Sequence, residues 1–122
     1  MKLRIKGNSL RMRLTKTEVS TLARTGFLED HTRFINSKFV YSLRSSYEAS
    51  ELSATFSNGT ITIFIPASFV QAWPENEVVG INTNMPLANN ESLYLLIEKD
   101  FICLDETTED QSDNYENPNK TC

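Results

Sequence analysis

The chain has 122 residues, which is enough for one domain with a hydrophobic core and too few for two. Its contents of 39% hydrophobic and 23% charged residues are those of ordinary globular proteins, and no apolar run reaches the roughly 18 residues of a membrane-spanning helix. The net charge of −4 hides an asymmetry: residues 1–44 hold ten Lys or Arg against three acids, and residues 45–122 hold two Lys against thirteen acids. This split predicts a surface that binds polyanions, an acidic tail, or both.

Residues 2–14 predict a β-hairpin that turns at Gly7-Asn8, because the apolar residues switch there from odd to even positions. A glycine-centred bulge within one long strand is the alternative. The pairs that the hairpin predicts are Lys2 with Arg13, Leu3 with Met12, Arg4 with Arg11 and Ile5 with Leu10. This register places the apolar side chains, with that of Leu14, on one buried face and the four cations on the other.

The next residues predict a helix, because Thr15 and Glu18 have the spacing of a capping box and Gly26 suits a left-handed C-cap. Strands are predicted over 27–34, 38–44, 51–56, 60–65, 77–83, 92–99 and 101–104, with a hairpin turn at Asn58-Gly59. Pro66 favours a short helix over 67–73. Since strands and helices do not alternate regularly, we predict an α+β fold with a mostly antiparallel, strongly curved or barrel-like sheet and two short helices.

The C-terminal segment differs in composition from the rest of the chain. Residues 1–104 are predicted to form a single α+β domain, whereas residues 105–122 hold six acids and no aliphatic side chain. Such a composition favours disorder or a position along the surface. We expect the segment to dock on the domain, because its charge is opposite to that of the N-terminal part.

Two terminal motifs resemble those of a known family. The chain begins with K-x-R-I-K-G-N-S-L-R-x-R-L-T-x-x-E-V and ends with C-L-D-x-x-x-E-D-x-x-D-x-Y-x-N-P-N. Both are similar to an uncharacterised family of small bacterial proteins, and the resemblance spans nearly the whole chain. It implies a bacterial cytosolic domain and assigns no activity to any residue.

The four cations of the hairpin, Lys2, Arg4, Arg11 and Arg13, are the first candidate site. Like charges that face each other across a sheet are destabilising, so something anionic should lie against them. The three alternatives are acids from neighbouring strands, the acidic C-terminal segment of the same chain, and an external acidic protein or small anion. Nucleic acid is disfavoured, because the whole protein is acidic and no recognition motif is present.

A zinc site is the second candidate, with Cys103, Cys122, His31 and Asp105 as its ligands. The cysteines lack the C-x-x-C spacing of a zinc knuckle. We therefore prefer to interpret Cys103 as a small buried residue and Cys122 as an accessible thiol, with no cofactor. The acids from Asp105 to Asp113 lack the glycine and the spacing of a calcium loop.

These observations predict a binding domain rather than an enzyme. A single histidine and scattered serines offer no nucleophile, base and orienting group at a recognisable spacing. The preferred function is a cytoplasmic domain that binds an acidic partner or small anion through its basic hairpin and is modulated by its acidic C-terminal segment. The alternative is a metal-binding accessory protein. The start of the chain has no signal-peptide pattern, which is the basis for expecting the cytoplasm.

Overall fold

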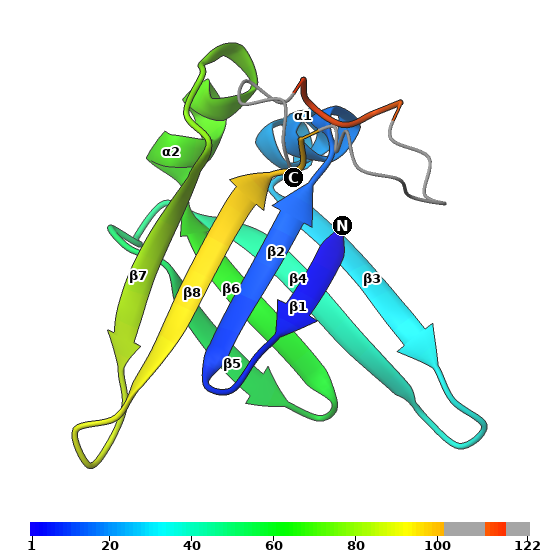
Figure 1. Cartoon of the computed structure of the whole chain (residues 1–122), viewed down its shortest axis with the longest axis vertical. Coiled ribbons are helices and arrows are strands. Elements are labelled where there is room, and N and C mark those ends of the chain that lie inside the picture. Colours follow the sequence, from blue (N-terminus) through cyan, green and yellow to red (C-terminus); the bar gives the residue numbers. More distant parts are fainter. Residues whose placement is uncertain (102–111, 117–122) are drawn as a thin grey trace.

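The computed structural model describes residues 1–101 and 112–116, and Figure 1 shows how their elements are arranged. The first half contains β1 (Lys2–Ile5), β2 (Ser9–Leu14), α1 (Lys16–Thr25), β3 (Phe27–Arg33) and β4 (Lys38–Ser46). The second half contains β5 (Ser53–Ser57), β6 (Thr60–Pro66), α2 (Ala67–Ala72), the 3-10 helix η1 (Trp73–Glu75), β7 (Gly80–Pro86) and β8 (Ser92–Lys99). Of the strand predicted over 101–104, only Phe101 is described, in a single bridge with Tyr115.

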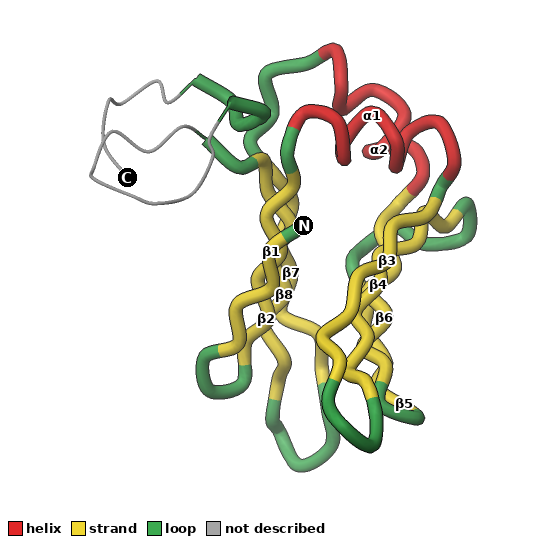
Figure 2. Tube along the Cα trace, turned by 90° about the vertical axis from the view of Figure 1, so that its right-hand side faces the viewer, coloured by secondary structure: helices red, strands yellow, loops and turns green. Residues whose placement is uncertain are grey.

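The strands form two four-stranded sheets that face each other, and the helices cover one end of the space between them (Figure 2). Sheet A has the order β1-β2-β8-β7 and sheet B the order β3-β4-β6-β5. In each sheet the outer pairs are antiparallel, whereas the central pair, β2 with β8 or β4 with β6, is parallel.

The prediction of a mostly antiparallel, strongly curved or barrel-like sheet is therefore wrong. The described strands form two mixed sheets, and neither sheet closes on itself. The error has a physical cause: turn residues and alternation identify hairpins, which are local and antiparallel. The parallel pairs join strands that no short turn connects, so the local sequence does not reveal them.

The N-terminal hairpin has the predicted register. Lys2 pairs with Arg13, Leu3 with Met12, Arg4 with Arg11 and Ile5 with Leu10. The chain turns at Gly7, whose φ is +53°, a conformation that glycine adopts without the steric cost of a Cβ. One detail of the prediction is wrong, because Ile5 is 56% exposed although Leu10, Met12 and Leu14 are buried.

Helix α1 begins and ends as predicted. The Thr15 side chain accepts a hydrogen bond from the backbone of Glu18, and the Glu18 side chain accepts one from the backbone of Thr15. At the other end Gly26 is left-handed, and its amide donates to the carbonyl of Leu22. This capping satisfies backbone groups that a helix end otherwise leaves without partners.

The turn at Asn58-Gly59 and the short second helix are also confirmed. Asn58 and Gly59 both have positive φ, of 52° and 74°, which a type I′ hairpin turn requires. Helix α2 follows Pro66 directly and ends at Ala72, where η1 continues the chain through Pro74.

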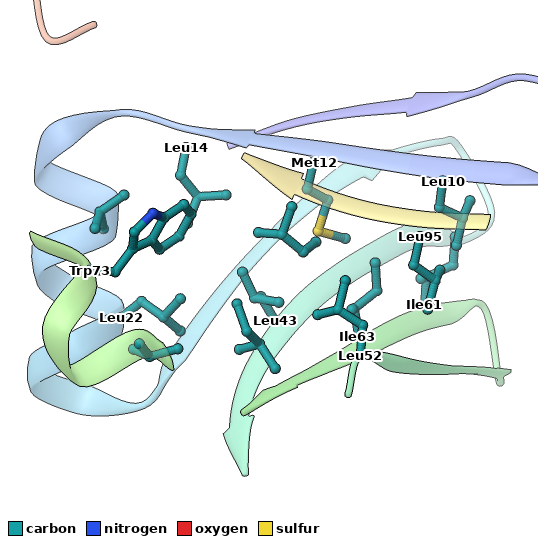
Figure 3. Packing of buried hydrophobic residues seen from close by; sticks show 14 residues of the cluster. Leu10, Met12, Leu14, Leu22, Leu43, Leu52, Ile61, Ile63, Trp73 and Leu95 are labelled. Carbon is teal, nitrogen blue, oxygen red and sulfur yellow. The ribbon is translucent and has the colours of Figure 1, made fainter. Parts of the chain in front are cut away.

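One hydrophobic core lies between the two sheets and beneath the helices (Figure 3). Its members come from both sheets and from α1, α2 and η1, and Trp73 is the largest fully buried side chain. The central strands supply alternate residues to it: Leu10, Met12 and Leu14 from β2, Leu95 and Ile97 from β8, Leu43 from β4, and Ile61, Ile63 and Ile65 from β6.

The elements from β1 to β8 form two copies of one structural unit, a hairpin, a helix and a second hairpin. The pairing of Ile5 with Leu10 in the first unit has its counterpart in the pairing of Phe56 with Ile61 in the second. We call residues that occupy the same place in the two registers equivalent. Each sheet combines the first hairpin of one unit with the second hairpin of the other.

Candidate functional site

The four predicted cations lie together on the outer face of sheet A. Because alternate residues of a strand point to opposite sides, the register places Lys2, Arg13 and Glu98 in one row across β1, β2 and β8. Arg4, Arg11 and Leu96 form the next row. We call Lys2, Arg4, Arg11 and Arg13 the basic face.

Glu98 of β8 neutralises part of the basic face. Its Oε1 accepts hydrogen bonds from Nε of Arg11 at 2.6 Å and from Nε of Arg13 at 3.0 Å. The Glu98 side chain is 13% exposed, while both arginines are partly exposed. One carboxylate thus lies between two guanidinium groups, and hydrogen bonds with charged partners on both sides are stronger than neutral ones. An acid from a neighbouring strand therefore meets Arg11 and Arg13.

Asp100, which follows β8, meets Lys2 at the end of the face. Nζ of Lys2 lies 3.1 Å from Oδ2 of Asp100, in an ion pair whose geometry is not that of a hydrogen bond. The Asp100 side chain is only 6% exposed, whereas that of Lys2 is 48% exposed. A buried carboxylate needs a counter-charge, and Lys2 supplies one.

Arg4 differs from the other three cations. Its side chain is exposed, and no residue of the described ranges forms an ion pair or a side-chain hydrogen bond with it. Among residues 1–101 and 112–116, the acids that pair with the basic face are Glu98 and Asp100, and Arg4 pairs with neither of them.

Lys99 points to the opposite side of sheet A and is 4% exposed. Its Nζ donates a hydrogen bond to the carbonyl of Asn76 at 2.7 Å and lies 4.9 Å from the ring centre of Tyr115. Burial lowers the pKa of Lys99 from its usual value of 10.5, and the charge of Glu77 opposes this effect. Lys99 is therefore a structural cation and not part of the basic face.

Residues 112–116 contact the beginning of α1. The carbonyl of Asp113 accepts a hydrogen bond from the Lys16 amide at 3.0 Å, and its carboxylate accepts one from Oγ1 of Thr17 at 3.0 Å. Hydrogen bonds from Thr15 and Thr17 lower the pKa of Asp113, since they favour its charged form.

Tyr115 continues this contact toward the end of the basic face. Its amide donates to the carbonyl of Asp100 at 2.6 Å, and Asp100 is the residue that pairs with Lys2. Residues 105–111 and 117–122, which hold most of the acidic segment, lie outside the described ranges. Docking of the whole segment on the domain thus stays a prediction.

The candidate zinc ligands are not brought together among the described residues. Cys103, Asp105 and Cys122 lie outside the described ranges. His31 is exposed on β3, the edge strand of sheet B. Residues 1–101 and 112–116 contain no group of three potential metal ligands. The zinc hypothesis and the predicted states of the two cysteines stay untested.

Sequence reasoning missed the acids that meet the basic face. Glu98 occupies the last outward position of β8 and Asp100 directly follows the strand, while Lys99 follows Leu95 and Ile97 on the inward side. The alternation of apolar and polar residues along 92–99 could have indicated that Glu98 points outward. The position of β8 beside β2 did not follow from the local sequence, because the pairing is parallel and joins opposite ends of the chain.

No helix in the described part of the chain combines the length and the apolar character that crossing a membrane requires. Neither the curated proteins nor the solved structures yielded a match to this sequence. A family of unknown function, DUF7009, matches residues 1–119 and thus includes both the basic hairpin and most of the acidic C-terminal segment. The chain belongs to the DUF7009 family.

Proposed function

We propose that this chain is a non-enzymatic binding domain whose basic face holds an acidic protein or a small anion. Arg4 supports this proposal, since it is exposed and pairs with no acid of residues 1–101 and 112–116. Arg4 in particular offers an exposed guanidinium group, which can bind a carboxylate or phosphate through two hydrogen bonds.

The comparison of the two structural units carries the proposal. The residues equivalent to the four cations are uncharged: Ser53, Thr55, Thr62 and Phe64. The fold therefore tolerates neutral side chains at these positions. Moreover, the basic face places Lys2 opposite Arg13 and Arg4 opposite Arg11, and like charges opposite each other lower stability. Lys2, Arg11 and Arg13 also balance the nearly buried Glu98 and Asp100, whereas Arg4, which meets no acid among the described residues, lies opposite Arg11 and lowers stability without such a gain. The charge of Arg4 therefore supports a binding role.

The acidic C-terminal segment is part of the same proposal. Tyr115 is bonded to Asp100, the partner of Lys2, so the segment passes one end of the basic face. We propose that its acids compete with external anions for the cations, because a tethered group has a high effective concentration. A location in the bacterial cytoplasm, expected from the sequence, belongs to this proposal and awaits its own test.

Charge reversal tests the proposal. Binding of fluorescent polyglutamate and of inorganic phosphate would be measured at low and high salt for the full chain and for Arg4→Glu. The matched control is Arg33→Glu, which reverses an exposed charge on β3 of sheet B. We expect Arg4→Glu to weaken binding about tenfold at low salt, and less at high salt because exposed charges are screened. Equal effects of the two variants would contradict the proposal.

A second variant tests the competition. Replacement of Asp105, Glu106, Glu109 and Asp110 by the corresponding amides removes four negative charges and keeps the side-chain shapes. The neutralised chain should bind polyglutamate several-fold more tightly at low salt, with the difference fading at high salt. Unchanged affinity would show that the C-terminal acids do not modulate the face.

A further inference from the structure

We infer that the partner is an extended acidic segment that adds to sheet A as a fifth strand beside β1. This inference rests on the proposed function and specifies how the basic face is used. Strand β1 is the outermost strand of sheet A on the side of the basic face. Edge strands present backbone groups that can pair with another chain.

The backbone of β1 has two residues whose polar groups point away from β2. In an antiparallel pair, hydrogen-bonded and non-hydrogen-bonded residue pairs alternate. The amide of Lys6 donates to the carbonyl of Ser9, so these residues form a hydrogen-bonded pair next to the turn. Alternation from this pair leaves Leu3 and Ile5 with N–H and C=O groups directed to the open edge.

The second structural unit supports the outward direction of these amides and shows how such an amide can find an acceptor. Ala54 is equivalent to Leu3, since Ala54 pairs with Ile63 as Leu3 pairs with Met12. The Ala54 amide donates to Sδ of Met85 at 3.3 Å, and Met85 belongs to β7, the edge strand of the facing sheet. The described ranges show no comparable acceptor for the amide of Leu3 or of Ile5. Within the described part of the chain, the amides on the open edge of β1 therefore have no acceptor like the one that Met85 offers to β5.

The side chains of β1 define what an added strand must contain. On the outer side, its alternate residues would extend the rows of Lys2 and Arg4, where acids match the positive charge. On the inner side, its other residues would lie beside Leu3, which packs on the core, and Ile5, which is 56% exposed. Apolar residues there would remove the exposed surface of Ile5 from water. The partner segment therefore alternates acidic and apolar residues.

The other edges do not fit the same segment. Strand β3 carries Glu29 and Asp30, which would repel an acidic strand. Strand β7 has no cation within Gly80–Pro86 and ends in a proline. The cations of β1 also repel a second copy of the same edge, which is a common protection against self-association. The edge of β1 is thus selective for acidic strands.

Synthetic peptides test the inference with the full chain. One peptide alternates Glu and Val, and a second has the same composition with all Glu before all Val. Strand addition predicts that the alternating peptide binds at least tenfold more tightly than the block peptide. It also predicts that Arg4→Glu weakens the binding of the alternating peptide. Equal, salt-sensitive binding of both peptides would support the basic face and overturn strand addition. If neither peptide binds, both the proposed function of the basic face and the strand addition are wrong.

Backbone methylation identifies strand addition directly. Two versions of the alternating peptide carry N-methyl groups on either the Glu or the Val amides. Because a strand turns only alternate amides to its neighbour, one version should lose binding and the other should keep it. Equal behaviour of the two versions would overturn the inference.

A matched pair of protein variants completes the test. Ile5→Pro removes the outward amide, and proline fits an edge strand whose N–H faces away from its neighbour. Ile5→Ala shortens the side chain and keeps the amide. Strand addition predicts that the affinity for the alternating peptide is at least tenfold lower in Ile5→Pro than in Ile5→Ala. Thermal melts would establish that both variants are folded, and equal affinities would contradict the inference.

Discussion

Lys99 is a charged residue placed in the interior by the alternation of its strand. It follows Leu95 and Ile97 on the inward side of β8 and is 4% exposed. The carbonyl of Asn76 and the rings of Trp73 and Tyr115 surround its ammonium group. These contacts satisfy the amine only in part, because burial still lowers its pKa.

This shift makes the stability of the fold depend on pH. Since the folded-state pKa of Lys99 lies below its usual value of 10.5, the unfolded chain binds the proton more tightly. The free energy of unfolding therefore carries a penalty at low pH that disappears as pH rises from the folded-state pKa to 10.5. Lys99→Met removes the titrating group, so the native chain should gain stability relative to this variant between pH 7 and about 10.

Urea denaturation of both proteins across this pH range measures the effect. The two proteins differ in unfolding free energy at every pH, because Lys99→Met also loses packing and the hydrogen bond to Asn76. The test is therefore whether this difference changes with pH. A difference that stays constant would contradict the burial of a charged amine at this position.

The two kinds of strand pairing separate what the sequence predicts from what it does not. Local turns and alternation predicted the register of β1 with β2 and the turn at Asn58-Gly59, because those contacts are close along the chain. The parallel pairs of β2 with β8 and of β4 with β6 depend on the assembly of the whole core. For the same reason the basic face was predicted residue by residue, whereas its partner Glu98 was not.

Gly80 shows how closely β7 approaches β8 beside the basic face. A Cβ at this position would lie 2.3 Å from the carbonyl oxygen of Ile97 and 2.9 Å from Cα of Glu98. Both atoms belong to the backbone, so β7 itself would have to move. Gly80→Ala should therefore lower the free energy of unfolding by about 1–3 kcal/mol, as overpacking typically does.

Asn82→Ala is the matched control for Gly80→Ala. It introduces the same residue on the same strand, at an exposed position, and should change the free energy of unfolding by about 0.5 kcal/mol or less. Chemical denaturation of the two variants gives the comparison. If both variants were equally stable, the close approach of β7 to β8 would not be a constraint on this sheet.

At the scale of the whole molecule, the two structural units are interlocked. Each sheet contains a hairpin from each unit, so neither unit can form a complete sheet by itself. The core is shared in the same way: Trp73 of the second unit lies near Leu14 and Leu22 of the first (Figure 3). A shared core and shared sheets predict that the chain unfolds as one cooperative unit.

Truncation of equivalent core residues tests this cooperativity. Leu14 in β2 and Ile65 in β6 are equivalent, because they directly follow the equivalent residues Arg13 and Phe64, and both are fully buried. Leu14→Ala and Ile65→Ala should each lower the free energy of unfolding by about 2–5 kcal/mol. Leu87→Ala, at a position that is 41% exposed, should have little effect.

Two probes decide whether the units unfold together. Far-UV circular dichroism reports on both units, whereas the fluorescence of Trp73, the only tryptophan of the chain, reports on the core beneath the helices. In both core variants the two denaturation curves should coincide, because removing a contact from either unit weakens the same core. Separate transitions in Leu14→Ala, with the fluorescence of Trp73 retained while circular dichroism is lost, would show that the second unit is stable alone. The interlocked sheets argue against that outcome, since β6 would then lack β4 and β8 would lack β2.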